Sequence, residues 1–469
     1  MESIMIRSAF SFITVLILAG CSLFQPQVRP DAPIDLPERY SLYTVEEPGP
    51  GRWWEAFGSD ELNLLVDTAI AGNFDVRSAW ARLKQADAVA RQAGADLKPD
   101  VEYNAGAEKS WRQTKTDGSG IERSNDETLS AGLTAAYELD LWGRLAALRQ
   151  SETLELEASR EDLDAAVVTI AAEVVTTWID ILSLRRQIDI LNEQIDLNRR
   201  MLKLQVLRFA NGQSDALEVA QQKEALAQAK ANLPPLQLEE QVQRNALAVL
   251  LGLAGSGNVA VDQSTLPELI ALPAAGVPAD ILAARPDVRA AGLRLKSNDW
   301  QVSAARADRL PSLTLSADAV FSSDSLDLLF SNWVATLAAS ITGPIFDGGY
   351  RAAEVDKTRA EAEEAMTAYA QTVAEAIQEV EDSLATETRQ AEYITLLEEE
   401  LGASLASMKA SRLQYLNGQA NYLDYLSAWT NVQSLERQLV DEKATRIKNR
   451  VTLYRTLGGD WTRNLAGDA

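Results

Sequence analysis

The chain has 469 residues and a formal net charge of −24 at pH 7, from 44 basic and 68 acidic side chains. This charge disfavours nucleic acid and anionic lipid headgroups as partners. The sequence contains no histidine, which removes the commonest metal ligand and the usual general base near neutral pH. An enzymatic function is therefore disfavoured, and we predict neither a metal site nor a cofactor.

The N-terminal segment is typical of a bacterial lipoprotein signal. An apolar run over residues 10–20 follows Arg7 and ends in Leu18-Ala19-Gly20-Cys21, a lipoprotein-type cleavage box. We therefore expect residues 1–20 to be removed and Cys21 to carry a covalent lipid. Ser22 follows the cysteine in place of aspartate, which favours transfer to the outer membrane.

The N-terminal region also allows an alternative to the signal peptide and a different start codon, and it predicts a tether. A short transmembrane anchor with an incidental cysteine is the alternative to a signal peptide. Glu2 is unusual in a signal peptide, and translation from Met5 would remove it. Residues 21–52 contain six prolines, so we predict an extended tether between the lipid and the folded part.

Four sequence motifs occur twice in the same order, with offsets of about 206 to 212 residues. Collinear repeats predict a fused pair of similar structural units. We assign these units to residues 53–254 and 280–461, with a linker at 255–279 and a C-terminal tail at 462–469. The motif pairs are Asn73–Ala79 with Arg285–Ala291, Asp140–Arg144 with Asp347–Arg351, Phe209–Gln213 with Tyr415–Gln419, and Leu251-Gly252 with Leu457-Gly458.

Two long segments without glycine or proline predict long helices. Residues 145–211 and 350–401 are dominated by Ala, Glu, Leu, Gln and Arg, which are strong helix formers. Between Ala165 and Leu182, apolar residues recur at alternating spacings of three and four, as in a coiled-coil seam. A helix of about 60 residues would be roughly 90 Å long, which is longer than a compact soluble core requires.

Each long helix leads to an Asn-Gly-Gln turn, at 211–213 and 417–419, and then to a return helix, at 215–251 and 422–457. A glycine just past a helix end supplies the left-handed cap, so each half is predicted to contain an antiparallel helical hairpin. Pro234-Pro235 interrupts only the first return helix. Each half is predicted to open with a shorter amphipathic helix, at about 60–95 and 286–308.

Four segments alternate apolar with polar or small residues and predict transmembrane β-strands. Such alternation over about ten residues, with aromatic residues toward the ends, is the pattern of outer membrane strands, although two hairpins of a soluble sheet would share it. The segments are 101–108, 129–139, 313–319 and 333–341. The predicted lumen-facing residues are Glu102, Asn104, Glu108, Thr314, Ser316 and Asp318, whose acidity would favour cations; a merely solvated face has the same composition.

The number of strands predicts the stoichiometry. Four strands cannot span a bilayer alone, because open edges would leave unpaired backbone groups in hydrocarbon. Eight strands are the practical minimum for a barrel, and the eight strands of two chains would enclose too narrow a pore. Three chains give twelve strands, so a pore favours a homotrimer.

Several long motifs resemble the lipoprotein branch of the TolC family of outer membrane efflux ducts. They are Trp53–Phe57, Tyr137–Arg144, Arg285–Arg289 and Gly343–Gly349, at the spacing of that family. The resemblance covers nearly everything after the tether. It implies a mainly helical fold with four membrane β-strands per chain, a trimer that closes one shared twelve-stranded barrel, and a coiled-coil tunnel across the periplasm.

The resemblance also implies a function and partners. The chain would be a passive exit duct in the outer membrane of a Gram-negative bacterium, anchored by lipid, and would meet a periplasmic adaptor protein and an inner-membrane pump of the RND type. A duct for type I protein secretion is the alternative within this class. A lipid-anchored periplasmic coiled-coil scaffold with a small soluble sheet is the alternative from another class, and a carboxylate hydrolase is the weakest. The cargo is not encoded in these motifs.

The resemblance places a periplasmic gate near the two turns. In the family, a tyrosine before the second turn and acidic residues after it constrict the entrance, and Tyr415 and Asp424 occupy those positions here. Three Asp424 carboxylates near one axis would repel each other or hold a cation; exposed capping residues are the alternative. The gate candidates are Tyr415, Asp424, Asp215 and Glu218. The chain departs from the family at Ala420 and Ser427, where the family has a basic residue and a second aspartate.

The turns themselves are the predicted contact with the adaptor. Their small side chains and exposed backbone would be presented at the end of the tunnel. The candidates are Gly212, Gln213, Gly418 and Gln419.

Overall fold

The fold is taken from a computed structural model. It describes residues 25–26, 36–37, 40, 51–116, 120–254, 259–269, 272 and 278–458. The predicted signal peptide, the predicted lipidation site Cys21 and the C-terminal tail therefore lie outside the described residues, as do most of the tether and part of the linker. The chain divides into two compact units. We call them the strand unit, with residues 82–160 and 290–370, and the hairpin unit, with residues 51–81, 161–289 and 371–458.

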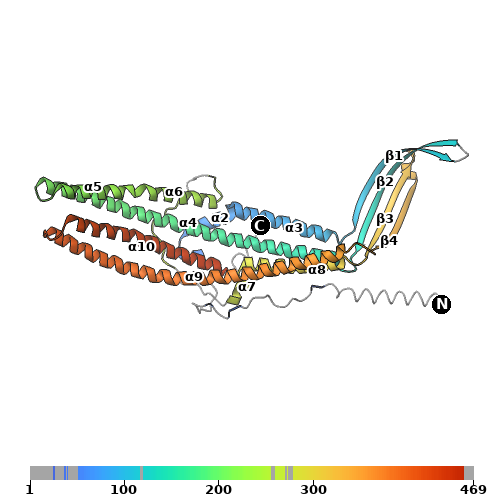
Figure 1. The fold of residues 1–469 in the computed structure, drawn as a ribbon. Helices are drawn as coiled ribbons and strands as arrows, with labels where there is room; N and C mark the ends of the chain where they lie inside the picture. Colours follow the sequence, from blue (N-terminus) through green and yellow to red (C-terminus); the bar gives the residue numbers. More distant parts are fainter. Residues whose placement is uncertain are drawn as a thin grey trace. The chain divides into compact units, whose positions relative to one another are not determined.

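The helices agree closely with the prediction. Both long helices are 67 residues long, and each is followed by a return helix after a short turn (Figure 1). The bounds are α2 Asp60–Gly72, α3 Phe74–Ala95, α4 Arg144–Ala210, α5 Ala216–Ala231, α6 Leu233–Leu250, α7 Ile281–Ala284, α8 Pro286–Ala307, α9 Tyr350–Leu416 and α10 Tyr422–Leu457, with short 3-10 helices at Trp53–Phe57, Pro278–Asp280 and Leu329–Ser331.

The prediction of one helix over residues 60–95 is wrong, because the chain breaks at Asn73. The Asn73 side chain accepts hydrogen bonds from the backbone N–H groups of Asp75 and Val76, at 2.8 and 3.2 Å, and so caps α3. Its amide donates to the carbonyl of Leu250 at 3.0 Å. A Cβ at Gly72 would lie 2.7 Å from the carbonyl oxygen of Leu251. Close packing of two backbones thus fixes the break.

The interruption of the first return helix is confirmed. α5 ends at Ala231, and α6 restarts at Leu233 with prolines in its first turn, where a missing N–H is tolerated. The second return helix, α10, runs unbroken for 36 residues.

The core of the hairpin unit follows the predicted coiled-coil seam. In α4, Val175, Ile179 and Leu182 are completely buried. Trp53, from the motif ahead of α2, stacks on Tyr454 of α10 with ring centroids 5.5 Å apart. The Trp53–Phe57 motif therefore contributes to the packing of the hairpin unit.

The strand unit contains one antiparallel sheet in the order β1-β2-β3-β4. The strands are β1 Asp100–Thr116, β2 Gly120–Leu139, β3 Ser312–Ser323 and β4 Trp333–Thr342. β1 and β2 are longer than predicted and continue past the point where β3 ends, opposite Leu129 (Figure 1). The residues of this extension do not alternate apolar with polar side chains, so the pattern did not predict them as strand. In the structure they pair across the two strands, for example Lys109 with Glu127, which also form an ion pair.

The register separates polar from apolar residues. One row across the sheet is Glu102, Thr134, Asp318 and Thr336, so the six predicted lumen residues share one face of the sheet. The opposite face carries large apolar side chains that are open to solvent in the single chain: Tyr103 is 86% exposed, Leu337 is 84% exposed and Ile341 is 74% exposed.

Candidate functional site

The two helical turns have the same backbone geometry. Gly212 and Gly418 adopt left-handed conformations with φ of 68° and 71°. After each glycine, the backbone N–H of the glutamine donates to the carbonyl five residues earlier, at 2.9 and 2.8 Å, which is a Schellman cap. The four residues predicted to contact an adaptor, which also include Gln213 and Gln419, are all exposed.

Tyr415 links the two helical hairpins. Its side chain is only 8% exposed, and its hydroxyl donates to Glu218 Oε2 at 2.6 Å. Arg208 Nη1 and Gln205 Nε2 donate to the same hydroxyl, at 2.8 and 3.2 Å. Burial, followed by the hydrogen bond to Glu218, raises the pKa of Tyr415 above its ordinary value. The bond network ties the end of α9 to α4 and α5.

The positive charge at this point comes from Arg208, which the sequence analysis missed. Its guanidinium carbon lies 4.8 Å from the centroid of the Tyr415 ring, and its Nη2 donates to the Gln213 carbonyl at 3.3 Å. Ser214 Oγ donates to Glu218 Oε2 at 2.7 Å. Nothing in the sequence indicated that Arg208 contacts Tyr415, because Arg208 precedes the first turn and Tyr415 precedes the second. The two residues belong to different hairpins and meet only through the packing of α4 beside α9.

A second set of hydrogen bonds joins the two hairpins further from the Asn-Gly-Gln turns. The Tyr422 hydroxyl hydrogen-bonds Gln222 Oε1, and the Gln222 amide donates to the carbonyl and side-chain oxygens of Asn198, both at 3.0 Å. Aromatic and thioether side chains pack around this junction. The cluster comprises Ala225, Tyr415, Tyr422, Tyr425 and Leu426, with Met201, Met408 and Trp429 packed against it.

The contacts between the hairpins continue along α4 as a line of polar side chains. Gln194 Nε2 donates to the Gln433 carbonyl at 3.0 Å and its Oε1 accepts from Arg437. Further along, Lys448 donates to Asp180 at 2.7 Å. We call this line the polar seam. Its α4 members are Asp180, Gln187, Gln194, Asn198 and Gln205, at steps of seven, seven, four and seven residues; Asn198 reaches the second hairpin only through Gln222, and the other four bond it directly.

The polar seam contrasts with the packing inside the first hairpin. There α4 and α5 meet through Leu191, Ile195, Leu226 and Ala229. Over this stretch apolar contacts hold α4 against α5, while the polar seam joins α4 to the second hairpin. The heptad spacing of the polar residues was present in the sequence and could have identified this seam.

The remaining gate candidates stabilise helix starts. Asp215 caps α5 and accepts from the Glu218 backbone N–H at 2.8 Å. Asp424 is exposed, and its Oδ2 accepts from the Asn421 backbone N–H at 3.2 Å. The structure therefore brings Tyr415 and Glu218 together, while Asp215 and Asp424 act as local caps in the single chain.

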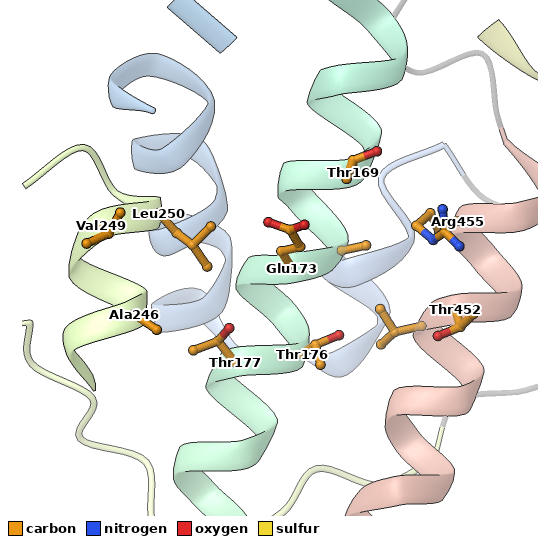
Figure 2. A pocket seen from close by; sticks show the side chains of 11 residues that line it. Thr169, Glu173, Thr176, Thr177, Ala246, Val249, Leu250, Thr452 and Arg455 are labelled. Carbon is orange, nitrogen blue, oxygen red and sulfur yellow. The ribbon is translucent and has the colours of Figure 1, made fainter. Parts of the chain in front are cut away.

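A separate pocket of about 640 Å³ lies between α4, α6 and α10 (Figure 2). Alanine, valine, leucine and threonine side chains form most of its wall, with Glu173 and Arg455 as the charged residues. None of the predicted site residues lines it. Within the described part of the chain, no group of three or more Cys, Asp or Glu side chains is placed to hold a metal ion.

We expect the hairpin unit to lose stability between pH 10 and about 12. Burial raises the pKa of Tyr425 from 10 to about 12, so the folded chain keeps a proton that the unfolded chain has lost. The stabilisation is complete below pH 10 and is lost as the pH rises toward 12. Unfolding midpoints measured across this range should fall less steeply for Tyr425→Phe; equal slopes would contradict the assignment.

Comparison with known proteins identifies the family. The outer membrane efflux protein family matches residues 65–253 and 277–459. The chain belongs to this family. It is 32% identical over 423 residues to the pyoverdine export outer membrane protein OpmQ of Pseudomonas aeruginosa, covering 89% of each chain. It is 27% identical over 460 residues to the cation efflux system protein CusC of Escherichia coli, covering 96% of this chain and 98% of CusC.

Solved structures agree with this family assignment. The outer membrane channel OprN superposes with a TM-score of 0.85 at 28% identity, over 93% of this chain and 99% of OprN. CusC superposes with a TM-score of 0.84 at 25% identity, over 94% of this chain and all of CusC. The resemblance to the TolC family, inferred from motifs, is confirmed, and the family is one of outer membrane efflux channels rather than enzymes.

Proposed function

We propose that this protein is the passive outer membrane exit duct of a tripartite efflux system, working as a homotrimer. The observation that carries the proposal is the single-chain sheet, in which β1 and β4 are edge strands and every residue of β4 is exposed. Edges of this kind are untenable in hydrocarbon. Three chains would pair β4 of one copy with β1 of the next and close twelve strands.

The two faces of the sheet support the same proposal. The apolar face, with Tyr103 and Leu337, would contact lipid, and the face with Glu102 and Asp318 would line the exit. A lipid-anchored periplasmic scaffold would leave the apolar face in water. The same order of elements in both halves, helix, two strands, long helix and return helix, supports the proposed duplication.

The partners follow from the family. We propose a periplasmic adaptor at the two turns and an inner-membrane pump of the RND type, with Cys21 lipidated in the outer membrane. Relatives named for pyoverdine export and cation efflux favour small molecules or ions as cargo over secreted proteins. The chain itself would perform no chemistry.

The gate is proposed to be the junction of the two hairpins. Widening the entrance requires the hairpins to separate, which breaks the bonds from Tyr415 to Glu218 and Arg208 and then those of the polar seam. Water can replace these polar contacts when the hairpins separate, whereas the aromatic cluster around Tyr422 would also lose its packing against the first hairpin.

The first test is the mass of Cys21→Ser protein exported by a non-lipoprotein signal and extracted from membranes in detergent. A membrane-embedded particle of three chains that conducts ions in a planar bilayer is expected. A monomer released without detergent would mean that lipid was the only anchor, and the scaffold interpretation would replace the duct.

Asp424→Ala is expected to loosen the closed state, raising channel conductance and antibiotic leakage. Asp424→Asn separates the two roles of this residue, since it keeps an acceptor for the Asn421 N–H but removes the charge. If both variants leak equally, the charge closes the gate. If only the alanine variant leaks, the cap is responsible, and if neither does, Asp424 has no role in closure.

Gly418→Val is expected to abolish export while leaving trimers intact. A valine Cβ would meet no atom within 4 Å, but φ of 71° is strained for any L side chain, by about 1–2 kcal/mol or more, so the turn would change shape where the adaptor binds. Gly402→Val is the control, since this exposed glycine in α9 also has open space around a Cβ. Loss of trimers would show that Gly418 is only a folding requirement.

A further inference from the structure

The hairpin of β1 and β2 continues beyond the four-stranded sheet as a two-stranded ribbon. Its pairs run without interruption from Lys109 opposite Glu127 to Lys115 opposite Ile121 (Figure 1). We call residues 109–115 and 121–127 the outer ribbon. Because the ladder contains no bulge, the alternation of faces established in the sheet carries on into the ribbon.

The two faces of the outer ribbon carry opposite charge. The face continuous with the apolar side of the sheet bears three cations and one carboxylate, a net charge of +2. The other face bears Arg112, Glu122 and Asp126, a net charge of −1. The charged residues of the first face are Lys109, Lys115, Arg123 and Glu127. A positive face is notable in a chain whose overall charge of −24 disfavours anionic partners.

The positive face also carries exposed apolar groups. Trp111 is 70% exposed and Ile121 is 57% exposed. The Lys109 ammonium lies 5.9 Å from the centroid of the Trp111 ring. Aromatic side chains of this kind mark the boundary between the apolar band of a membrane strand and the headgroup region. The cations thus begin where the apolar face of the sheet ends.

We propose that this face of the outer ribbon binds the phosphate groups of lipopolysaccharide in the outer leaflet. The inference rests on the proposed membrane-spanning duct, since it takes the apolar face of the sheet as the lipid-facing side. Lys115 and Arg123 contact phosphates above the membrane surface, and Trp111 lies at the surface with Lys109.

The length of the positive face favours lipopolysaccharide over phospholipid. Lys109 and Lys115 are six residues apart, about 20 Å along the strand; because the ribbon bends away from the strands of the sheet (Figure 1), its extent along the membrane normal is less than this length. A phospholipid headgroup layer is only about 5–8 Å thick on each side. Phosphates at two depths are present in a glycolipid with a phosphorylated core, whereas a phospholipid offers only the lower one.

Purified full-length protein in detergent micelles is titrated with lipopolysaccharide, with the same lipopolysaccharide after removal of its phosphates, and with phosphatidylglycerol. The test variant is the double substitution Lys115→Glu and Arg123→Glu. The matched control is Arg112→Glu, which reverses a charge on the opposite face of the same ribbon. Circular dichroism checks that each variant is folded, and bilayer conductance of the wild type reports separately on the proposed duct.

We expect the double variant to bind lipopolysaccharide at least tenfold more weakly than the wild type, and Arg112→Glu to bind within twofold of it. Removal of the phosphates should weaken wild-type binding, as should higher salt. Equal binding by the double variant, or equal binding of phosphate-free lipopolysaccharide, would overturn the proposal. Equally tight binding of phosphatidylglycerol would overturn the assignment to lipopolysaccharide. Wild-type protein that conducts but fails these tests refutes only this inference; absence of conductance refutes the duct.

Discussion

Tyr415→Phe is expected to shift the gate toward its open form about ten- to hundredfold. The substitution removes a hydroxyl that hydrogen-bonds Glu218, Arg208 and Gln205 in a buried position. Hydrogen bonds to charged groups contribute about 1.5–3 kcal/mol, which converts to that range at about 1.4 kcal/mol for each factor of ten. The ring and its packing are retained, so the core of the tip should survive.

The expected result is measured as single-channel conductance and as cell sensitivity to a large antibiotic that an intact outer membrane excludes. Tyr393→Phe is the matched control. Its hydroxyl also accepts a hydrogen bond, from Gln438 at 2.9 Å, but this bond joins α9 to α10 within one hairpin. Conductance raised equally by both variants would show that loss of any tyrosine hydroxyl loosens the helices and that Tyr415 has no special position.

A charge-removing variant tests the same junction from the other hairpin. Glu218→Gln keeps an acceptor for the Tyr415 hydroxyl and for Ser214 but removes the negative charge next to Arg208. If closure depends on charge, Glu218→Gln should open the gate nearly as far as Tyr415→Phe, and the double variant should add little, because both residues belong to one network. Additive effects would indicate two independent contacts.

The long helices and their turns were predictable because their signals are local. A stretch of about 60 residues that is free of glycine and proline and dominated by strong helix formers favours a helix, and Gly212 and Gly418 end α4 and α9 because glycine adopts a left-handed φ without strain. The break at Asn73 also had a local signal, since asparagine is a good helix cap, but the amphipathic pattern continued across it. The packing of Gly72 against Leu251, which fixes the break, joins distant parts of the chain and had no local signal.

The contacts between the hairpins were harder to predict. Gln222 and Tyr422 are 200 residues apart in the chain, and nothing in the amino acids around them indicates that they meet. The family resemblance pointed to Tyr415 because of its place before a turn. It did not indicate Arg208, whose role depends on how the end of α4 packs beside α9. Partners on different helices require the register between the helices, which periodicity alone does not fix.

Periodicity also misassigns charged residues, as the second hairpin illustrates. Pattern arguments place glutamate and arginine on the solvated side of a helix, yet the side chains of Glu387 in α9 and Arg450 in α10 are only 5% and 3% exposed. They form an ion pair of 2.6 Å, and Arg446 adds a second contact to the same carboxylate oxygen at 3.2 Å. The pair joins the two helices well away from the turns.

Glu387→Ala is expected to destabilise the hairpin unit by about 3–5 kcal/mol, because it leaves the Arg450 charge buried without this carboxylate. The exposed pair of Lys443 and Glu398, at 2.7 Å, joins the same two helices and supplies the control. Glu398→Ala should cost less than about 1 kcal/mol, since water screens that pair. Unfolding midpoints in urea compare the two variants directly.

Replacing both buried partners tests whether the helices need the ion pair itself or only need to avoid an unmatched buried charge. Glu387→Met combined with Arg450→Met removes both charges and fills similar volume, so stability should return close to that of the wild type or exceed it. If the double variant is instead as unstable as Glu387→Ala, the helices depend on the ion pair itself rather than on avoiding an unmatched buried charge. If it is stable but no longer conducts, the pair sets the register of α10 against α9, and through it the positions of Tyr415 and Tyr422 at the turn.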